Sequence, residues 1–166
     1  MIDRATVALR VVPLLLVTGT TLMSTIVVIG NVTDPGSNLK FIERIMSMDT
    51  TYQSPRLMWR AIRSRMLQRL SFAFIVICEA LVTVIGWIGV VSLMTNLYSS
   101  ADRWHEAKYW AVVALCLAIF VWLIMFEVIG NEWFASWQSN NWKVTNETAR
   151  INLVTFAGLI LLQLSR

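Results

Sequence analysis

The amino-acid sequence predicts an all-α membrane protein, a four-transmembrane-helix up-down-up-down bundle with interfacial amphipathic helices in the first loop. Hydrophobic residues make up 57% of the 166 residues and charged residues only 14%. The mean hydropathy of +0.62 lies above that of soluble domains. Four apolar stretches are long enough, or nearly so, to cross a bilayer, at residues 9–32, 70–97, 109–130 and 148–164. In lipid such helices satisfy their own backbone hydrogen bonds.

The length of the chain predicts a single membrane domain over residues 1–166. Two long loops, 33–69 and 131–147, connect the expected spans, and the longer one has too few residues for a core of its own. The net charge of +4 is typical of the Lys and Arg residues that orient membrane proteins and contact anionic headgroups. We therefore expect the lipid bilayer as a partner and no nucleic acid.

The first span carries small and hydroxylated residues in its middle, from Thr18 to Thr25. Such residues let another helix approach closely and can form hydrogen bonds across the interface. The pattern fits a helix-packing face, and a face that lines a solute path is the alternative.

The first loop opens with a turn cluster that includes Asp34, and Asp49 follows further along the loop. Two amphipathic stretches are expected to form helices, residues 39–48 and 56–69. In the second stretch Trp59 belongs to the apolar face and Arg60 to the basic face. This pattern favours an interfacial helix, with its Trp at the headgroup level and its arginines toward lipid phosphates. A helix docked on the bundle or on a partner is the alternative.

The fourth span is the shortest of the four. Thr148–Ser165 would rise about 27 Å as a helix, close to the ~30 Å hydrocarbon core of a bilayer. The short loop 98–108 makes the second and third spans an antiparallel hairpin.

The third loop contains the densest aromatic cluster of the chain. Its polar and aromatic residues are Glu132, Trp133, Trp137, Gln138 and Trp142. Trp gathers at the membrane–water boundary, so an aromatic anchor is expected, with a ligand-stacking site as the alternative. Because Trp133 and Trp137 are four residues apart, we expect them to share one helical face.

The polar residues inside the spans concentrate at the level of the two long loops. They are Glu79 and Glu127, with Asn31 and Asn152 at the same level and Arg150 as a candidate counter-charge. A buried carboxyl in lipid must face the bundle interior, a water-filled pocket or a cation. Glu79 is expected either to pair structurally with Arg150 or to have a proton, ion or ligand role, and Glu127 is expected to be structural.

Several chemistries have no pattern in the sequence. His105 is the only histidine, which rules out bis-histidine haem within one chain. No Cys, His and acidic cluster has the spacing of a metal site, and no phosphate loop or nucleophile motif is present. We expect no cofactor, no metal and no enzymatic activity.

Several short motifs together resemble one bacterial family. They are Asn31-Val32-Thr33-Asp34, Ser47-Met48-Asp49-Thr50-Thr51, Trp59-Arg60-Ala61-Ile62, Glu79-Ala80 and Glu132-Trp133-Phe134, followed by Trp137-Gln138-Ser139 and Trp142. The chain resembles the predicted small integral membrane proteins, domain of unknown function 2165. The resemblance implies a four-span protein of the bacterial cytoplasmic (inner) membrane, and it implies no activity.

Three functions remain open. The first is a non-catalytic accessory or interaction subunit of a larger membrane complex, with other membrane subunits or a second copy as partners. The second is a small transporter or proton- or ion-coupled carrier that uses Glu79. The third is a lipid- or quinone-binding module built on the tryptophan loop.

The orientation in the membrane has two opposing signals. The flanks of the first span, Arg4 and Arg10 against Asp34, favour a cytoplasmic N-terminus, although the Lys and Arg count of the whole chain favours the reverse.

Overall fold

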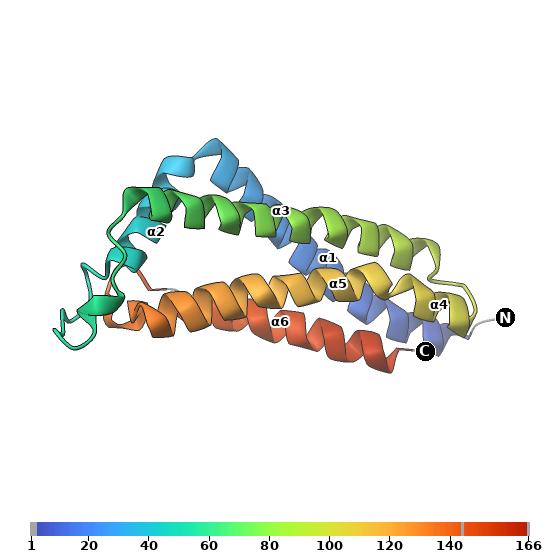
Figure 1. Cartoon of the computed structure of the whole chain (residues 1–166). Helices are drawn as coiled ribbons and strands as arrows, with labels where there is room; N and C mark the ends of the chain where they lie inside the picture. The colour runs from blue at the N-terminus through green and yellow to red at the C-terminus, as the bar shows by residue number, and fades with distance from the viewer. Residues whose placement is uncertain (1–2, 144, 166) are drawn as a thin grey trace.

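The computed structural model describes residues 3–143 and 145–165, and its elements in these ranges are all helical. The elements are α1 (Arg4–Thr33), α2 (Pro35–Ser47), η1 (Met58–Arg60), α3 (Arg65–Thr95), α4 (Ala101–Ala107), α5 (Tyr109–Ile119), η2 (Phe120–Trp133), η3 (Ser136–Gln138) and α6 (Thr145–Leu164). The long helices run side by side, and α2 and the long loops gather at one end (Figure 1). We call this the loop end. The start of α1 and the end of α6 lie at the opposite end.

Three helices are long and apolar enough to cross a membrane. They are Arg4–Thr33, Arg65–Thr95 and the continuous helix Ala101–Trp133 formed by α4, α5 and η2. The apolar part of α6, Thr148–Leu164, is shorter than these three. The structure thus supports an all-helical membrane protein with three candidate spans.

The packing of the long helices brings α1 against both α3 and α6, and α5 against the same two helices. Small residues allow close approaches between these helices. A Cβ atom added to Gly89 of α3 would lie 2.6 Å from the backbone nitrogen of Ala111. One added to Gly86 would lie 2.5 Å from Oγ1 of Thr21 on α1. The hydroxyl of Ser24 donates across the same α1–α3 contact to the carbonyl of Glu79, at 3.0 Å. These contacts support the helix-packing interpretation of the hydroxylated face.

The buried apolar side chains form a cluster at each end of the molecule and one between them. The cluster of the opposite end is centred on Trp104, Leu93 and Leu115. The middle cluster includes Val82, Ala118, Val121 and Trp122. The loop-end cluster joins Ile42, Ile45 and Met46 of α2 to Phe134 and Ala135.

Helix α2 forms where the sequence predicts the first amphipathic helix, but it begins at Pro35 rather than at residue 39. Proline suits this first turn because its missing N–H has no helical partner there. The helix ends at Ser47, and the C-cap residue Met48 adopts a left-handed conformation with φ of 53°. Its apolar face is buried against α3 and the end of η2, so α2 closes the loop end of the protein.

The second amphipathic helix, predicted over residues 56–69, does not form. Only Met58–Arg60 makes a short 3₁₀ turn, and α3 starts at Arg65 after Ser64. The backbone between them is used for other hydrogen bonds. Ile62 N–H donates to the carbonyl of Met46 at 2.7 Å, and Nε2 of Gln68 donates to the carbonyl of Ile62 at 2.8 Å. This segment is therefore tied to α2 and α3 and makes no continuous amphipathic face.

The third span changes its winding at Phe120. Beyond this residue η2 forms wider π-helical turns, and the N–H of Phe134 still donates to the carbonyl five residues earlier, at Ile129, at 3.0 Å. Such winding is rare outside short stretches and is frequent at functional sites. It lies in the half of the span nearest the loop end.

Candidate functional site

The carboxylate of Glu79 is buried between α1 and α3. Its side chain is 2% exposed, and Nδ2 of Asn31 donates to Oε2 at 2.6 Å. Asn31 lies in the last turn of α1, whereas Glu79 lies fourteen residues into α3 (79 − 65). Helix α3 therefore extends well past the end of α1, and α2 packs on this extension.

The expected pairing of Glu79 with Arg150 is not what the structure contains. The described hydrogen bond to the Glu79 side chain comes from Asn31, and no ion pair of Glu79 occurs within the described ranges. Arg150 is exposed on α6 and lines a surface hollow with Gly19 and Thr20 of α1. A carboxamide can replace an arginine here because it donates a hydrogen bond at a lower desolvation cost than a second buried charge.

Glu127 belongs to a separate network that joins η2 to α6. Its Oε2 accepts a short hydrogen bond from the hydroxyl of Thr148, and its Oε1 accepts one from Nδ2 of Asn131 at 3.2 Å. Asn131 is buried and accepts in turn from the hydroxyl of Ser136 at 3.2 Å. This arrangement agrees with a structural role for Glu127. Asn31 and Glu79 are thus joined in one network, and the described hydrogen bonds of Glu127 belong to another.

Asn152 is also buried, on α6. Its side-chain oxygen accepts no hydrogen bond from the part of the chain that the structure describes. Buried polar atoms of this kind are uncommon in proteins.

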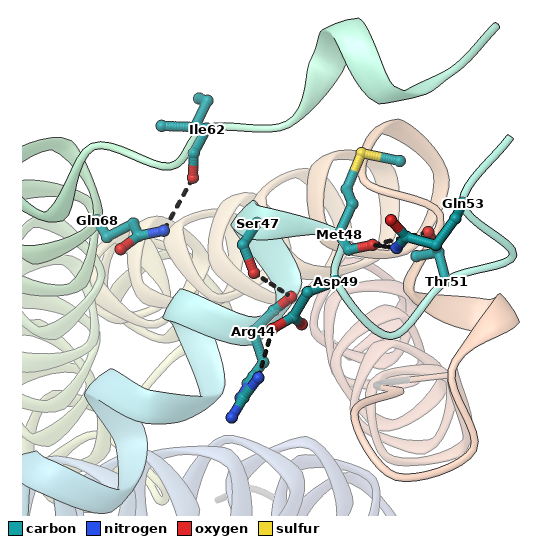
Figure 2. A network of polar contacts seen from close by, with 8 residues as sticks. All are labelled: Arg44, Ser47, Met48, Asp49, Thr51, Gln53, Ile62 and Gln68. Carbon is teal, nitrogen blue, oxygen red and sulfur yellow. Dashed lines mark hydrogen bonds and ion pairs between the residues drawn. The ribbon is translucent and has the colours of Figure 1, made fainter. Parts of the chain in front are cut away.

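The first-loop residues Asp34 and Asp49 hold the two ends of α2. Oδ1 of Asp34 accepts from the N–H of Ser37 at 3.3 Å and caps the start of the helix. The hydrogen bonds from Ser37 hold the pKa of Asp34 below its usual value. At the other end Asp49 forms an ion pair with Arg44, as Figure 2 shows.

The turn after α2 is fixed by further hydrogen bonds to the carbonyl of Met48 (Figure 2). The hydroxyl of Thr51 donates to it at 2.8 Å, and Nε2 of Gln53 donates to it as well. The chain reversal at Met48 is therefore closed by side chains that follow it.

Two aromatic pairs join the first long loop to the third. The rings of Trp59 and Trp133 meet edge to face, with centroids 5.5 Å apart. The guanidinium of Arg60 lies 4.9 Å from the Trp133 centroid and 5.6 Å from the Trp59 centroid. Tyr52 and Trp137 form the second edge-to-face pair, at 6.2 Å. We call these five residues the aromatic ledge.

Other third-loop residues tie the loops to each other. The N–H of Tyr52 donates to Oε1 of Gln138 at 3.0 Å. The ring of Trp142 packs against Phe41 of α2, with centroids 6.1 Å apart. Glu132 is exposed, and its Oε1 lies 3.5 Å from Nδ2 of Asn131.

The prediction that Trp133 and Trp137 share one helical face is wrong. Trp133 ends η2, and Trp137 belongs to the 3₁₀ turn η3. Between them Ala135 adopts a left-handed conformation with φ of 52°, which ends the helix and redirects the chain. The two indoles consequently have different partners in the first loop.

The structure also contains a buried basic group at the opposite end that sequence reasoning missed. Arg10 is 1% exposed and donates to the carbonyls of Leu97 and Ser99, at 3.0 and 2.7 Å. Nζ of Lys108 donates to the carbonyl of Ser165. The signal in the sequence was the position of Arg10 inside an apolar stretch, where an arginine needs partners.

Comparison with known proteins agrees with this description. The family described as predicted small integral membrane protein (DUF2165) matches residues 9–165 of the chain. No curated protein and no solved structure matches the chain.

Proposed function

We propose, from the premise that the chain belongs to the family of predicted small integral membrane proteins, that it is a non-catalytic accessory or interaction subunit. It acts within a larger complex of the bacterial cytoplasmic membrane. In this proposal α6 is a fourth span, so the chain forms an up-down-up-down bundle with a cytoplasmic N-terminus.

The outer surface of α6 supports a fourth span. Leu153, Phe156, Ile160 and Leu164 are exposed along this helix, as expected for a face in contact with lipid. Its apolar part, Thr148–Leu164, rises about 26 Å, close to the thickness of a hydrocarbon core. A reporter fused after Arg166 tests this point. With four spans and a cytoplasmic N-terminus it is fluorescent in the cytoplasm, and phosphatase activity there instead contradicts the topology.

The observation that carries the interaction role is the aromatic ledge. Trp59 and Tyr52 are 69% and 73% exposed, although each has a fixed ring partner in the third loop. Trp, Tyr and Arg are the residue types that dominate binding energy at protein interfaces. Because the side chains are already held in place, binding a partner costs little ordering entropy. A simple lipid anchor needs the rings but not the Arg60 contact.

The partner that fits this surface is another membrane protein with an acidic or aromatic group at the membrane boundary. The Arg60 guanidinium, held against two indoles, supplies a cation and planar surface for such a group.

Site-specific photocrosslinking in cells tests the interaction role. A photoreactive phenylalanine analogue at Trp59 is expected to give one protein adduct of defined mass, and the adduct is lost when Arg60→Ala is added. The matched control places the analogue at Leu153, which is 72% exposed on α6 and far from the ledge in sequence. An adduct of twice the chain mass identifies self-association. Lipid adducts alone at Trp59 contradict the proposal.

A coupled carrier is the second candidate, because the buried carboxylate of Glu79 borders a cavity. Proton flux into liposomes containing the purified protein tests it. Glu79→Gln abolishes the flux if the carrier interpretation holds, and a parent protein without flux argues against it.

A further inference from the structure

A small cavity lies beside Glu79 at the loop end. Its volume is about 130 Å³, and its walls come from α1, α2, α3 and η2. An engineered protein cavity of about 150 Å³ binds benzene, so this space accommodates a small chemical group. Helix α2 covers it, because Asn38, Phe41 and Ile42 of that helix line it.

The polar wall of the cavity consists of Glu79, Asn31 and Asn38, of which Asn38 is exposed. Glu79 and Asn31 are both more than nine-tenths buried, at 2% and 7% exposure. The amide nitrogen of Asn31 is used by Oε2 of Glu79. Within the described part of the chain, Oε1 of Glu79 accepts no further hydrogen bond. No lysine, arginine or histidine is among the described residues that line the cavity. The cavity therefore presents an acidic group without a basic one.

The remaining walls include three phenyl rings. Phe41, Phe72 and Phe126 come from α2, α3 and η2 and surround the same space as the carboxylate. Aromatic faces attract cations, and proteins recognise ammonium groups with such rings. A carboxylate together with aromatic walls selects a positively charged head over a neutral or anionic one.

A larger apolar groove adjoins this cavity. Its volume is about 240 Å³, and it shares Ile42, Ile75 and Phe126 with the cavity. The groove extends along α3 and η2 past Phe74 and Ile129, which are exposed on the outer surface of the helices. Its lining is almost wholly aliphatic and aromatic, which suits a hydrocarbon chain.

We propose that the cavity and the groove together bind an amphiphile with a small ammonium head and an aliphatic tail. The ammonium occupies the cavity, donates to Oε1 of Glu79 and contacts the phenyl rings, while the tail lies in the groove. This chemistry has two sources, an aminophospholipid of the bilayer or a lipophilic amine without phosphate. The site is independent of the docking role of the aromatic ledge.

Binding measurements on the purified full chain in an uncharged maltoside detergent test the site. Dodecylammonium is expected to bind at least about tenfold more tightly than dodecanol, which has the same tail and no charge. Glu79→Gln removes this preference, because it keeps the shape and the hydrogen bond from Asn31 but loses the charge. The matched control is Glu127→Gln, which changes a carboxylate in the Thr148 network, outside the lining of the cavity. It retains the preference.

The tail site has its own variant. Ile75 lines both the cavity and the groove, so the larger side chain of Ile75→Trp reduces the space in both. This variant is expected to weaken the binding of dodecylammonium and of dodecanol alike. Nanodiscs of phosphatidylethanolamine and of phosphatidylglycerol separate the two sources. Bound phosphatidylethanolamine that dodecylammonium displaces identifies the aminophospholipid, and dodecylammonium binding without it identifies a lipophilic amine.

Equal affinity for dodecylammonium and dodecanol overturns the proposal, and so does a preference that survives in Glu79→Gln. If Glu79→Gln does not fold, a photoreactive dodecylamine on the parent protein decides the question. Labelling of the α2, α3 or η2 residues around the cavity supports the site. Labelling confined to other parts of the protein excludes it.

Discussion

The guanidinium of Arg10 lies 4.9 Å from the centroid of the Trp104 ring, and both side chains are fully buried. This contact links the first turns of α1 to α4. The same guanidinium donates to the carbonyls of Leu97 and Ser99, in the turn that follows α3. The indole N–H of Trp104 donates in turn to the hydroxyl of Ser165, after α6, at 3.2 Å. One buried arginine and one indole thus hold together chain segments from the start, middle and end of the sequence.

Replacing Arg10 is therefore expected to destabilise the opposite end of the protein. Arg10→Ala leaves two carbonyls without their donor and removes the cation from the Trp104 ring. Hydrogen bonds to a charged group contribute about 1.5–3 kcal/mol, so we expect a loss of at least about 2 kcal/mol in the free energy of unfolding. Unfolding in mixed detergent micelles measures it. The control, Arg103→Ala, removes an exposed arginine next to Trp104 and is expected to change little. Equal effects of the two variants contradict the proposed linkage.

The contact between α3 and α5 gives a second prediction. A methyl group at Gly89 would lie 2.6 and 2.7 Å from backbone atoms of Ala111, which cannot move without displacing α5. Gly89→Ala is expected to cost about 1–3 kcal/mol, the usual range for overpacking a tight contact. The control is Gly19→Ala on α1, where an added Cβ meets nothing within 4 Å. That variant should be neutral or slightly more stable, because alanine favours helix more than glycine. A thermal melt in detergent compares the two, and a Gly89→Ala protein as stable as Gly19→Ala argues against this helix contact.

The long helices could be predicted from the sequence because lipid imposes a simple rule. An uninterrupted apolar stretch must satisfy its own backbone, so its position is visible without knowledge of its neighbours. The helix containing the first predicted span, residues 9–32, begins at Arg4 and ends at Thr33. Helix α2 was visible for a related reason. Its apolar residues recur at helical spacing over residues 39–48, but the turn cluster that includes Asp34 concealed its true start at Pro35.

The site could be predicted only in part, because its contacts depend on tertiary structure. Charge suggested Arg150 as the partner of Glu79, but the helix arrangement places Asn31 there instead. The four-residue spacing of Trp133 and Trp137 suggested that they share one helical face, but the left-handed backbone of Ala135 separates them. Nothing local in the sequence specifies either contact. The π-helical winding of η2 is likewise invisible, because α- and π-helical turns accept the same apolar residues.

The cap of α2 should make the stability of the protein depend on pH. In the folded state hydrogen bonds from Ser37 hold the pKa of Asp34 below its usual value. The stabilisation by this carboxylate is therefore complete above the unfolded pKa, near about 3.9, and is lost as the pH falls through the lower folded value. Asp34→Ala is expected to melt at a lower temperature than the parent at neutral pH, and the difference should shrink in acid.

Melting curves across the acid range measure this difference. The control is Asp102→Ala, which removes an exposed aspartate in the first turn of α4. The control should lower the melting temperature less than Asp34→Ala does at neutral pH. A difference between Asp34→Ala and the parent that stays constant down to strong acid would show that the carboxylate does not cap the helix through its charge.

The hydrogen bond between Asn31 and Glu79 leads to a prediction about energetic coupling. Asn31 Nδ2 lies 2.6 Å from Glu79 Oε2, so the two side chains should contribute to stability as a unit. Glu79→Met and Asn31→Leu each remove this bond and introduce no new charge. The double variant should therefore lose less stability than the sum of the single variants, by about 1–3 kcal/mol.

The same measurement with Arg150→Gln distinguishes the two candidate partners of Glu79. Arg150 is exposed and borders a hollow between α1 and α6. Neither Asn31 nor Glu79 lines this hollow. Glu79→Met and Arg150→Gln should therefore be additive within about 0.5 kcal/mol. The reverse pattern, additive Asn31 and coupled Arg150, would restore the ion pair that charge alone suggests. Coupling of Glu79 to Asn31 alone means that the carboxylate has no cationic partner in the helices, which is the condition under which an ammonium head can bind it.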